Sequence, residues 1–309
     1  MKGRTYLRFV ISCTAVIVLF SSYALAGTWQ SIDPLVSNYT QLYSVDGSNI
    51  LGCLHGVDDV RYNGTTWSYL PDVPGYSNTQ ASAISGGVVV GSCYSSPYSK
   101  KGFTYNGSSW TTYDAPGATY TWMEGIDGGN IVGNYQKGDA SYYSFLYNGS
   151  TWTTIGYYPG AKSSSVSSIS GDNIVGNYQQ SNGLGHGFVY NYKTTQWTNI
   201  DFPGASYTNI YDIDGQNIVG CYSLSGFHGF LYNGSTWTTL DFPGADYTQV
   251  EGISGNTLVG WYTTGSNGYP HGFVYTIPEP ATILLFGLGA RLCLRASPKR
   301  AAILRRKRS

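Results

Sequence analysis

Short runs of β-branched and aromatic residues alternate with polar turns along most of the chain. Residues 228–262 show this pattern most clearly, because an Asn-Gly pair at Asn233 and Gly234 separates two such runs. This arrangement is the strongest local signal for a β-hairpin with a two-residue turn of the primed type. The predicted turn would place Phe230 directly opposite Trp237 on the neighbouring strand. A cross-strand aromatic pair of this kind adds roughly 0.2 to 1 kcal/mol over two alanines.

The second half of the same stretch predicts two further strands. Pro243 and Gly244 indicate a turn after the hairpin, because proline presets its own φ and glycine permits the positive φ that follows. Strands are then expected at residues 248–253 and 257–262, joined by a polar turn. One unit of the sequence therefore contains about four short strands.

Close copies of this unit recur along the chain. The residues that align with Phe230 are spaced by 42 or 43 residues and are Val60, Phe103, Phe145, Phe188, Phe230 and Phe273. The aligned tryptophans are Trp29, Trp67, Trp110, Trp152, Trp197 and Trp237, and the aligned strand glycines are Gly52, Gly91, Gly133, Gly176, Gly220 and Gly260. A four-stranded repeat of this length is typical of a propeller blade. We therefore predict an all-β fold, a six-bladed β-propeller.

The phase of the repeats predicts how the ring closes. The repeat domain, residues 27–277, opens with the strand that carries Trp29 and ends with the strand that carries Phe273. These are the two halves of one hairpin, so the last unit is complete only if the N- and C-terminal strands pair. Closure of the ring leaves only short, protected strand edges.

Composition narrows the classes of partner. The chain has 309 residues with 41 glycines, 29 tyrosines and 11% charged residues, and its formal net charge is zero. Residues 27–277 hold 6 lysine and arginine residues against 16 aspartate and glutamate residues, a net charge of −10. Nucleic acid is therefore excluded as a partner, because its recognition needs a basic surface.

Cysteine usage leaves two alternatives. Cys53, Cys93 and Cys221 lie in the repeat domain, whereas Cys13 and Cys293 lie in the terminal segments. Their odd number and their non-equivalent or widely separated repeat positions favour buried free thiols. A disulfide between Cys53 and Cys93 is the alternative, since an exported protein folds in an oxidising compartment.

Three histidines occupy one repeat position, directly before Gly-Phe. They are His186, His228 and His271. A hydrogen-bonded strand cap is the expected role, and a metal or ligand site around the propeller axis is the alternative. We predict no bound metal and no cofactor.

In each sequence repeat, the strand equivalent to residues 248–253 is followed by a turn that begins with Asp or Ser in alternation. These residues are Asp46, Ser85, Asp127, Ser170, Asp214 and Ser254. Their side chains are expected to bond the backbone two residues further on, with calcium ligation as the alternative.

Few residues suggest catalysis. Glu124 and Glu251 occupy equivalent positions and are the two glutamates of the repeat domain. A glycosidase needs two carboxylates in distinct environments. However, the acidic residues follow the repeat, and the sequence shows no unrepeated Ser-His-Asp set or metal cluster. We therefore predict that the protein is not an enzyme and has no catalytic residues.

The N-terminal segment predicts export. Residues 1–26 begin with Lys2, Arg4 and Arg8, continue with an apolar run over residues 9–20, and end with small residues at Ala24 and Ala26. This is the pattern of a secretory signal peptide cleaved after Ala26. We expect the Sec translocon to export the chain across the inner membrane.

The C-terminal segment, residues 278–309, has a different character. Pro278, Glu279 and Pro280 precede an apolar run over residues 281–290, and a tail rich in arginine and lysine follows. The run is too short for a comfortable transmembrane helix, which needs about 20 apolar residues. A transient contact with the inner membrane is therefore expected, with the basic tail on the cytoplasmic side.

The tail resembles the PEP-CTERM sorting signal through Pro278-Glu279-Pro280, the apolar run and the arginines. The body resembles HAF-type extracellular repeats through His228-Gly229-Phe230, Pro243-Gly244-Ala245 and Ile218-Val219-Gly220-Cys221-Tyr222. These resemblances imply recognition by an exosortase in a Gram-negative bacterium, and a location at the cell surface or outside the cell. Such bacteria often make extracellular polysaccharide. Neither family supplies catalytic residues.

Together these features predict a non-enzymatic surface or matrix protein that binds polysaccharide or matrix components in a biofilm-forming bacterium. Aromatic faces stack on sugar rings, and exposed tyrosines add a hydroxyl to that surface. Two alternatives remain, a glycosidase or lyase on the same scaffold and a purely structural repeat protein.

Overall fold

The computed structural model describes residues 27–34, 38–55, 58–96, 99–265 and 268–278. The chain divides into one unit of residues 27–277 and a second of residues 1–26 with 278–309. The predicted cleavage residues Ala24 and Ala26 and the motif residues Glu279 and Pro280 lie outside the described residues. Every regular element among the described residues is a β-strand. These residues therefore contain no helix that is long and apolar enough to cross a membrane. The all-β prediction is confirmed.

Six antiparallel sets of four strands follow the six sequence repeats, and we number these units in chain order. Unit 1 is β2 (Thr40–Asp46), β3 (Asn49–Leu54), β4 (Asp58–Tyr62) and β5 (Trp67–Tyr69). Unit 2 is β6 (Asn78–Ser85), β7 (Val88–Ser96), β8 (Ser99–Tyr105) and β9 (Trp110–Tyr113). Unit 3 is β10 (Ala118–Asp127), β11 (Asn130–Lys137), β12 (Tyr142–Tyr147) and β13 (Trp152–Ile155).

The second half of the domain repeats the arrangement. Unit 4 is β14 (Ser163–Ser170), β15 (Asn173–Gln179), β16 (Gly185–Asn191) and β17 (Gln196–Ile200). Unit 5 is β18 (Tyr207–Asp214), β19 (Asn217–Ser223), β20 (Phe227–Tyr232) and β21 (Trp237–Leu240). Unit 6 is β22 (Tyr247–Ser254), β23 (Thr257–Thr263), β24 (His271–Thr276) and the N-terminal β1 (Thr28–Ser31).

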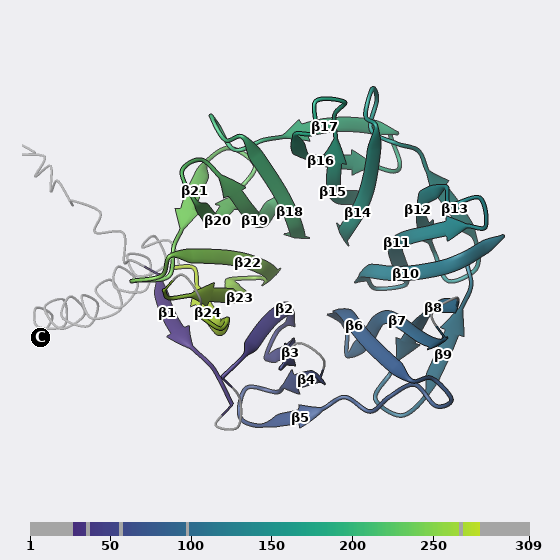
Figure 1. The fold of residues 1–309 in the computed structure, drawn as a ribbon, viewed down its shortest axis with the longest axis horizontal. Helices are drawn as coiled ribbons and strands as arrows, with labels where there is room; N and C mark the ends of the chain where they lie inside the picture. The colour runs from purple at the N-terminus through teal and green to yellow at the C-terminus, as the bar shows by residue number, and fades with distance from the viewer. Residues whose placement is uncertain (1–26, 35–37, 56–57, 97–98, 266–267, 279–309) are drawn as a thin grey trace, which may run out of the picture. The chain divides into compact units, whose positions relative to one another are not determined.

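The units form a propeller within residues 27–277, with the first strand of each unit nearest the axis (Figure 1). Each of these inner strands contacts the next one, and β22 contacts β2. β1 pairs with β24, with Trp29 opposite Tyr275, so the predicted pairing of the two terminal strands is confirmed. One parallel pair, Tyr120 with Lys100, joins units 2 and 3 into a single eight-stranded sheet.

The hairpin register differs from the prediction. Tyr232 lies opposite Trp237, and Phe230 lies opposite Thr239. The turn holds four residues because Asn233 Oδ1 accepts hydrogen bonds from the backbone N–H groups of Ser235 and Thr236, at 3.1 and 2.8 Å. The predicted two-residue turn and the directly opposed Phe230–Trp237 pair are therefore wrong. The two rings still meet edge to face, with centroids 5.0 Å apart.

The repeated phenylalanine and glycine form one packing device. Phe188 of unit 4 is buried and lies opposite Gly176. A Cβ on Gly176 would lie 2.1 Å from the backbone oxygen of Ser165 and 2.7 Å from the Phe188 ring. Only glycine therefore fits at this position, and full burial of each ring stabilises the fold by about 1.5 to 3 kcal/mol.

No disulfide links the cysteines that the structure describes. Cys93 and Cys221 are buried free thiols, and Cys53 is partly buried. Cys53 follows the strand glycine Gly52 by one residue, whereas Cys93 follows Gly91 by two. Because alternate strand residues point to opposite faces, the two side chains occupy different faces of their sheets. The alternative of a Cys53–Cys93 disulfide is therefore wrong, and the expectation of buried free thiols is confirmed for Cys93 and Cys221.

Candidate functional site

A β-bulge in every inner strand aims one side chain at the propeller axis. In unit 3 the register shifts between Met123 and Gly125, and in unit 6 between Val250 and Gly252. Bulges commonly redirect a side chain in this way. The six bulged residues all line one cavity of about 400 Å³, the central cavity, and are Tyr43, Ser82, Glu124, Ser167, Tyr211 and Glu251.

The two glutamates singled out from the sequence thus face the same central cavity. Burial raises the pKa of Glu251 to about 7, although hydrogen bonds from Trp261 and Gln249 oppose the shift. Burial also raises the pKa of Glu124, and here a hydrogen bond with Asn134 and the charge of Lys100 oppose it. A carboxylate that titrates near neutral pH is one property of a general acid.

The alternating Asp and Ser turns tie neighbouring units together. Asp127 Oδ2 accepts the N–H of Gly171 in the next unit at 2.7 Å, and Asp214 Oδ2 accepts that of Gly255 at 2.6 Å. The same contact joins Ser170 to Gly215 and, across the closure of the ring, Ser254 to Gly47. These residues were expected to bond the backbone of their own turn. The expectation missed the neighbouring turn because only the assembled ring brings it close.

Each of the three repeated histidines bonds an aspartate. The Nδ1 atoms of His186, His228 and His271 lie 2.9, 3.0 and 2.8 Å from carboxylate oxygens, which belong to Asp201, Asp241 and Asp33 respectively. Lys101 and Asp114 make the equivalent contact in unit 2, at 2.6 Å. In the part of the chain that is described, no group of three or more metal-ligating side chains is found. The histidines therefore link the third strand of a unit to the segment after the fourth.

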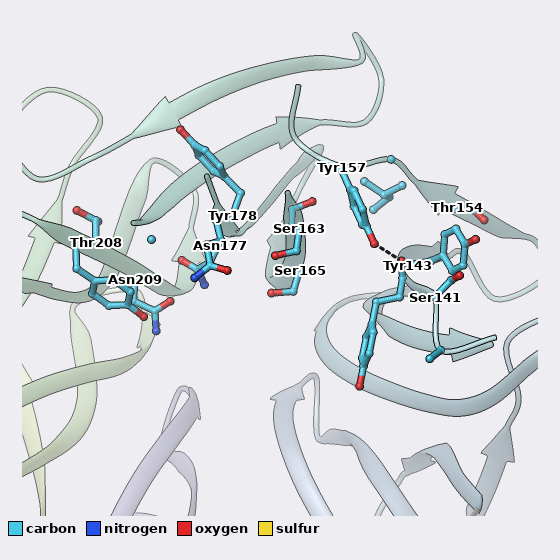
Figure 2. Close-up of a pocket in the computed structure, with 18 residues that line it drawn as sticks. Ser141, Tyr143, Thr154, Tyr157, Ser163, Ser165, Asn177, Tyr178, Thr208 and Asn209 are labelled. Atoms are coloured by element: carbon cyan, nitrogen blue, oxygen red, sulfur yellow. Dashed lines mark hydrogen bonds between the residues drawn. The ribbon is translucent and has the colours of Figure 1, made fainter. Parts of the chain in front are cut away.

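A cavity of about 860 Å³ crosses units 3, 4 and 5 near the starts of β12, β14 and β18. Figure 2 shows these side chains converging from separate strands on one hollow, which we call the groove. Five tyrosines line it, and they are Tyr142, Tyr143, Tyr157, Tyr178 and Tyr207. Its hydroxyl and amide side chains are Ser141, Thr154, Ser163, Ser164, Ser165, Asn177, Gln179, Thr208 and Asn209. None of the 18 lining residues is an acid, a lysine, an arginine or a histidine.

Local contacts fix the walls of the groove. The Tyr157 hydroxyl donates to the backbone oxygen of Tyr142 at 2.7 Å, which holds the turn after β13 against β12 (Figure 2). Asn177 bonds both backbone groups of Ile210, with its Oδ1 2.7 Å from the nitrogen and its Nδ2 2.9 Å from the oxygen, and so joins units 4 and 5. A Cβ on Gly185 would lie 2.4 Å from the Tyr207 ring. The absent side chain at Gly185 therefore leaves room for that tyrosine.

A second cavity of about 690 Å³ adjoins the groove, with Tyr142 lining both. We call it the aromatic pocket, and it is lined by Ser77, Tyr94, Ser95, Ser99, Lys100, Tyr120, Trp122, Gln136 and Tyr142. The rings of Trp122 and Tyr142 are stacked, 5.9 Å apart and inclined by 20°. Trp122 also lines the central cavity.

Sequence reasoning missed the residues of the groove and the aromatic pocket. In the sequence, two of these residues stand out because they differ from the residues at the equivalent positions of the other repeats. The positions equivalent to Trp122 in the other units all carry polar residues, Gln41, Gln80, Ser165, Asn209 and Gln249. Similarly, the position of Gly185 carries Phe227 in unit 5.

Comparisons with known proteins show no family for this chain. No protein-family model matches the chain, and no curated protein matches it. Among solved structures, a mutant of the Aleuria aurantia lectin in complex with alpha-methyl-L-fucoside is 15% identical, covers 79% of this chain and 97% of its own, and has a TM-score of 0.45. The β-propeller domain of the Trilobed protease from Pyrococcus furiosus is 7% identical, covers 78% and 82%, and has a TM-score of 0.49. TolB from Acinetobacter baumannii is 9% identical, covers 78% and 64%, and has a TM-score of 0.48.

Proposed function

We propose that the protein is a non-enzymatic carbohydrate-binding propeller and that the groove holds a polysaccharide. The observation that supports this best is the lining of the groove, which combines five tyrosines with nine hydroxyl or amide side chains and has no charged residue. A sugar presents hydroxyl groups at its edge and an apolar face, and these two surfaces match hydrogen-bonding side chains and aromatic rings. The same lining disfavours phosphates and metal ions, which need charged partners.

The shared wall of the two cavities favours a chain of sugars over a single sugar. Tyr142 is 49% exposed and lines both the groove and the aromatic pocket. A ligand that crosses this residue contacts residues of units 2 to 5 at once. Several weak contacts along one chain are additive in affinity without any deep pocket.

Affinity electrophoresis through gels that contain dextran, hydroxyethyl cellulose or galactomannan tests the proposal. At least one polymer should retard the wild-type protein, and Gly185→Phe should abolish that retardation because the new ring would displace Tyr207 and take up space in the groove. Gly129→Phe is the matched control, since Gly129 lies in the β10–β11 turn with open space around it. Unretarded migration in all three gels, or retardation that survives Gly185→Phe, would contradict the proposal.

A polysaccharide hydrolase or lyase is the second candidate, because Glu124 and Glu251 line one cavity and burial raises the pKa of both. In such an enzyme one carboxyl group donates a proton while the other acts as base or nucleophile. Assays for new reducing ends and for unsaturated products on the retarding polymer separate the two candidates. Product that disappears in both Glu124→Gln and Glu251→Gln would establish the enzyme. Unchanged polymer supports the binding protein.

We further propose that the Sec translocon exports the chain in a Gram-negative bacterium and that an exosortase sorts it to the cell surface. The signal-peptide pattern that ends at Ala24 and Ala26 and the Pro278-Glu279-Pro280 tail support this proposal. Mass spectrometry of the protein from its host should find an N-terminus at Gly27 and a processed C-terminal segment. Uncleaved ends on the mature protein would contradict it.

A further inference from the structure

We propose that the aromatic pocket selects an acidic sugar, a hexuronate unit of the polysaccharide, through Lys100 beside Trp122. The inference rests on the proposed function, because it names the chemistry of the chain that the groove binds. A hexuronate carries an apolar ring face and a carboxylate on the same residue. The pocket offers an aromatic face and an ammonium group for these two features.

The position of Lys100 is the first support. Its Nζ lies 4.8 Å from the centre of the Tyr94 ring and 5.3 Å from that of Trp122. Aromatic faces hold a cation at such distances without neutralising it. Lys100 forms no ion pair with a carboxylate among the residues that the structure describes, whereas its neighbour Lys101 is paired with Asp114 at 2.6 Å. Lys100 is therefore a fixed cation with capacity for an anionic partner.

The surroundings of Lys100 are the second support. It is the one charged residue of the nine that line the aromatic pocket. Burial lowers the pKa of Lys100, and the charge of Glu124 opposes that shift. A partly desolvated ammonium gains more from a carboxylate than an exposed one does. This single cation lies in a domain whose net charge is −10, so binding of an anion here depends on one local contact and not on a basic surface.

The stacked rings are the third support. Trp122 and Tyr142 incline by only 20° to each other, and the Tyr142 ring borders the neutral groove. A sugar that packs on these rings continues directly into the groove. A lone cation beside flat rings matches a sugar carboxylate better than a phosphate, since phosphate sites in proteins usually gather several donors. The expected ligand is therefore a polysaccharide that places an acidic sugar in the aromatic pocket and its adjoining part in the neutral groove.

The test compares acidic polymers with their own neutral forms. Polygalacturonate, alginate, hyaluronate and glucuronoxylan are each assayed by affinity electrophoresis beside the carboxyl-reduced form of the same polymer. At least one acidic form should bind about tenfold more tightly than its reduced form at 0.15 M salt. Lys100→Gln should abolish that preference while it leaves the affinity for the reduced form unchanged.

Lys193→Gln is the matched control, because the Lys193 Nζ lies 4.9 Å from the Tyr192 ring but lines neither cavity. This variant should keep the preference for the acidic polymer. Dextran sulfate distinguishes a carboxylate site from general attraction to anions, and it should bind no better than dextran. Equal binding of all acidic and reduced pairs, or a preference that survives Lys100→Gln, overturns the inference. If the reduced polymers still bind in that case, the proposed function stands. If no polymer of either form binds, and dextran, hydroxyethyl cellulose and galactomannan do not retard the protein either, both fail.

Discussion

Units 3 and 6 each carry a glutamate at the β-bulge of the inner strand, Glu124 and Glu251, but the side chains around the two glutamates interact differently. In unit 6, Gln249 donates to Glu251 and accepts from Tyr247, and Trp261 Nε1 donates to Glu251 at 3.1 Å. The rings of Tyr247 and Trp261 stack on each other at 4.8 Å. Every one of these groups is thus occupied within the unit.

In unit 3 the position of Gln249 holds Trp122. Glu124 is hydrogen-bonded to Asn134, which accepts from Ser144 Oγ at 2.8 Å and also bonds the backbone of Val166 in unit 4, so this network does not pass through Trp122. The Trp122 ring faces the aromatic pocket beside Tyr142 and Lys100. One backbone position thus serves an internal network in unit 6 and an open cavity in unit 3. The difference teaches that identical strand geometry does not decide where a repeat protein binds. The side chain at each strand position decides it.

The largest expected effect lies in the core that both units share. Phe145 of unit 3 and Phe273 of unit 6 are 1% and 0% exposed. Replacement of either by alanine should lower the free energy of unfolding by about 3 to 5 kcal/mol, because the change removes buried apolar surface and leaves a cavity. Urea denaturation measures both. A much smaller loss for Phe273→Ala would mean that Trp29, whose ring centre lies 5.0 Å from that of Phe273, is not packed in solution.

The pH dependence of stability should separate the two glutamates. The pKa of Glu251 is about 7 in the folded state against a usual value of 4.5, so the folded protein holds this proton more tightly than the unfolded chain does. Stability should therefore fall as pH rises from about 5 to 7, by at most about 1.4 kcal/mol per pH unit from this group.

Glu251→Gln should remove that part of the slope in urea titrations at several pH values. Glu124→Gln should change it less, because Lys100 and Asn134 oppose the rise in the pKa of Glu124. The slope from Asp212, whose pKa burial raises to about 6, remains in both variants. A wild-type slope that Glu251→Gln leaves intact would contradict the assignment.

Two tryptophan variants should give opposite results. Trp261→Gln should cost on the order of 1 to 3 kcal/mol of stability, because it removes a hydrogen bond and a stacked ring, and should leave polysaccharide binding unchanged. Trp122→Gln introduces the residue of units 1, 2 and 6 and should weaken binding about tenfold. It should cost less stability than Trp261→Gln, because it removes stacking on Tyr142 but not the hydrogen bond to Glu251. Chemical denaturation and affinity electrophoresis report the two properties separately. Equal effects of both variants on binding would remove the distinction between units 3 and 6.

The smallest effect is expected for Tyr157→Phe. The variant removes the hydrogen bond from the Tyr157 hydroxyl to the Tyr142 backbone oxygen but keeps the ring in the groove. Affinity for the polymer should fall about threefold, in line with one neutral hydrogen bond. Tyr69→Phe is a suitable control, since Tyr69 is 61% exposed and lines none of the cavities described above. A gain in affinity for Tyr157→Phe would contradict this account of the groove wall.

The sequence predicted those parts of the fold that repeat. Phe230, Gly220 and the Asn233 turn recur at a fixed spacing, and the phase of Trp29 and Phe273 predicted how the ring closes. The hairpin register failed because a side-chain atom of Asn233 extends the turn by two residues, which a backbone rule does not foresee.

The candidate site could not be predicted in the same way. The groove joins Tyr142, Ser165 and Asn209, which come from units 3, 4 and 5 and lie 23 and 44 residues apart along the chain. Only the assembled propeller brings these three residues together. None of them occupies one of the buried positions that recur in every repeat. Glu124 and Glu251 were identified in the sequence because they are the two glutamates of residues 27–277 and occupy equivalent repeat positions. Trp122 and Gly185 instead break the repeat, and they were missed.

Hydrogen–deuterium exchange of the wild-type protein, with and without the polymer that retards it most, tests the central claim most directly. We predict protection confined to the strand starts that border the groove and the aromatic pocket, residues 120–122, 141–143, 163–165 and 207–209. Protection at the opposite turns, around Asp127 and Gly171, or no protection at the groove, would contradict the claim that this neutral aromatic surface is where the protein binds its ligand.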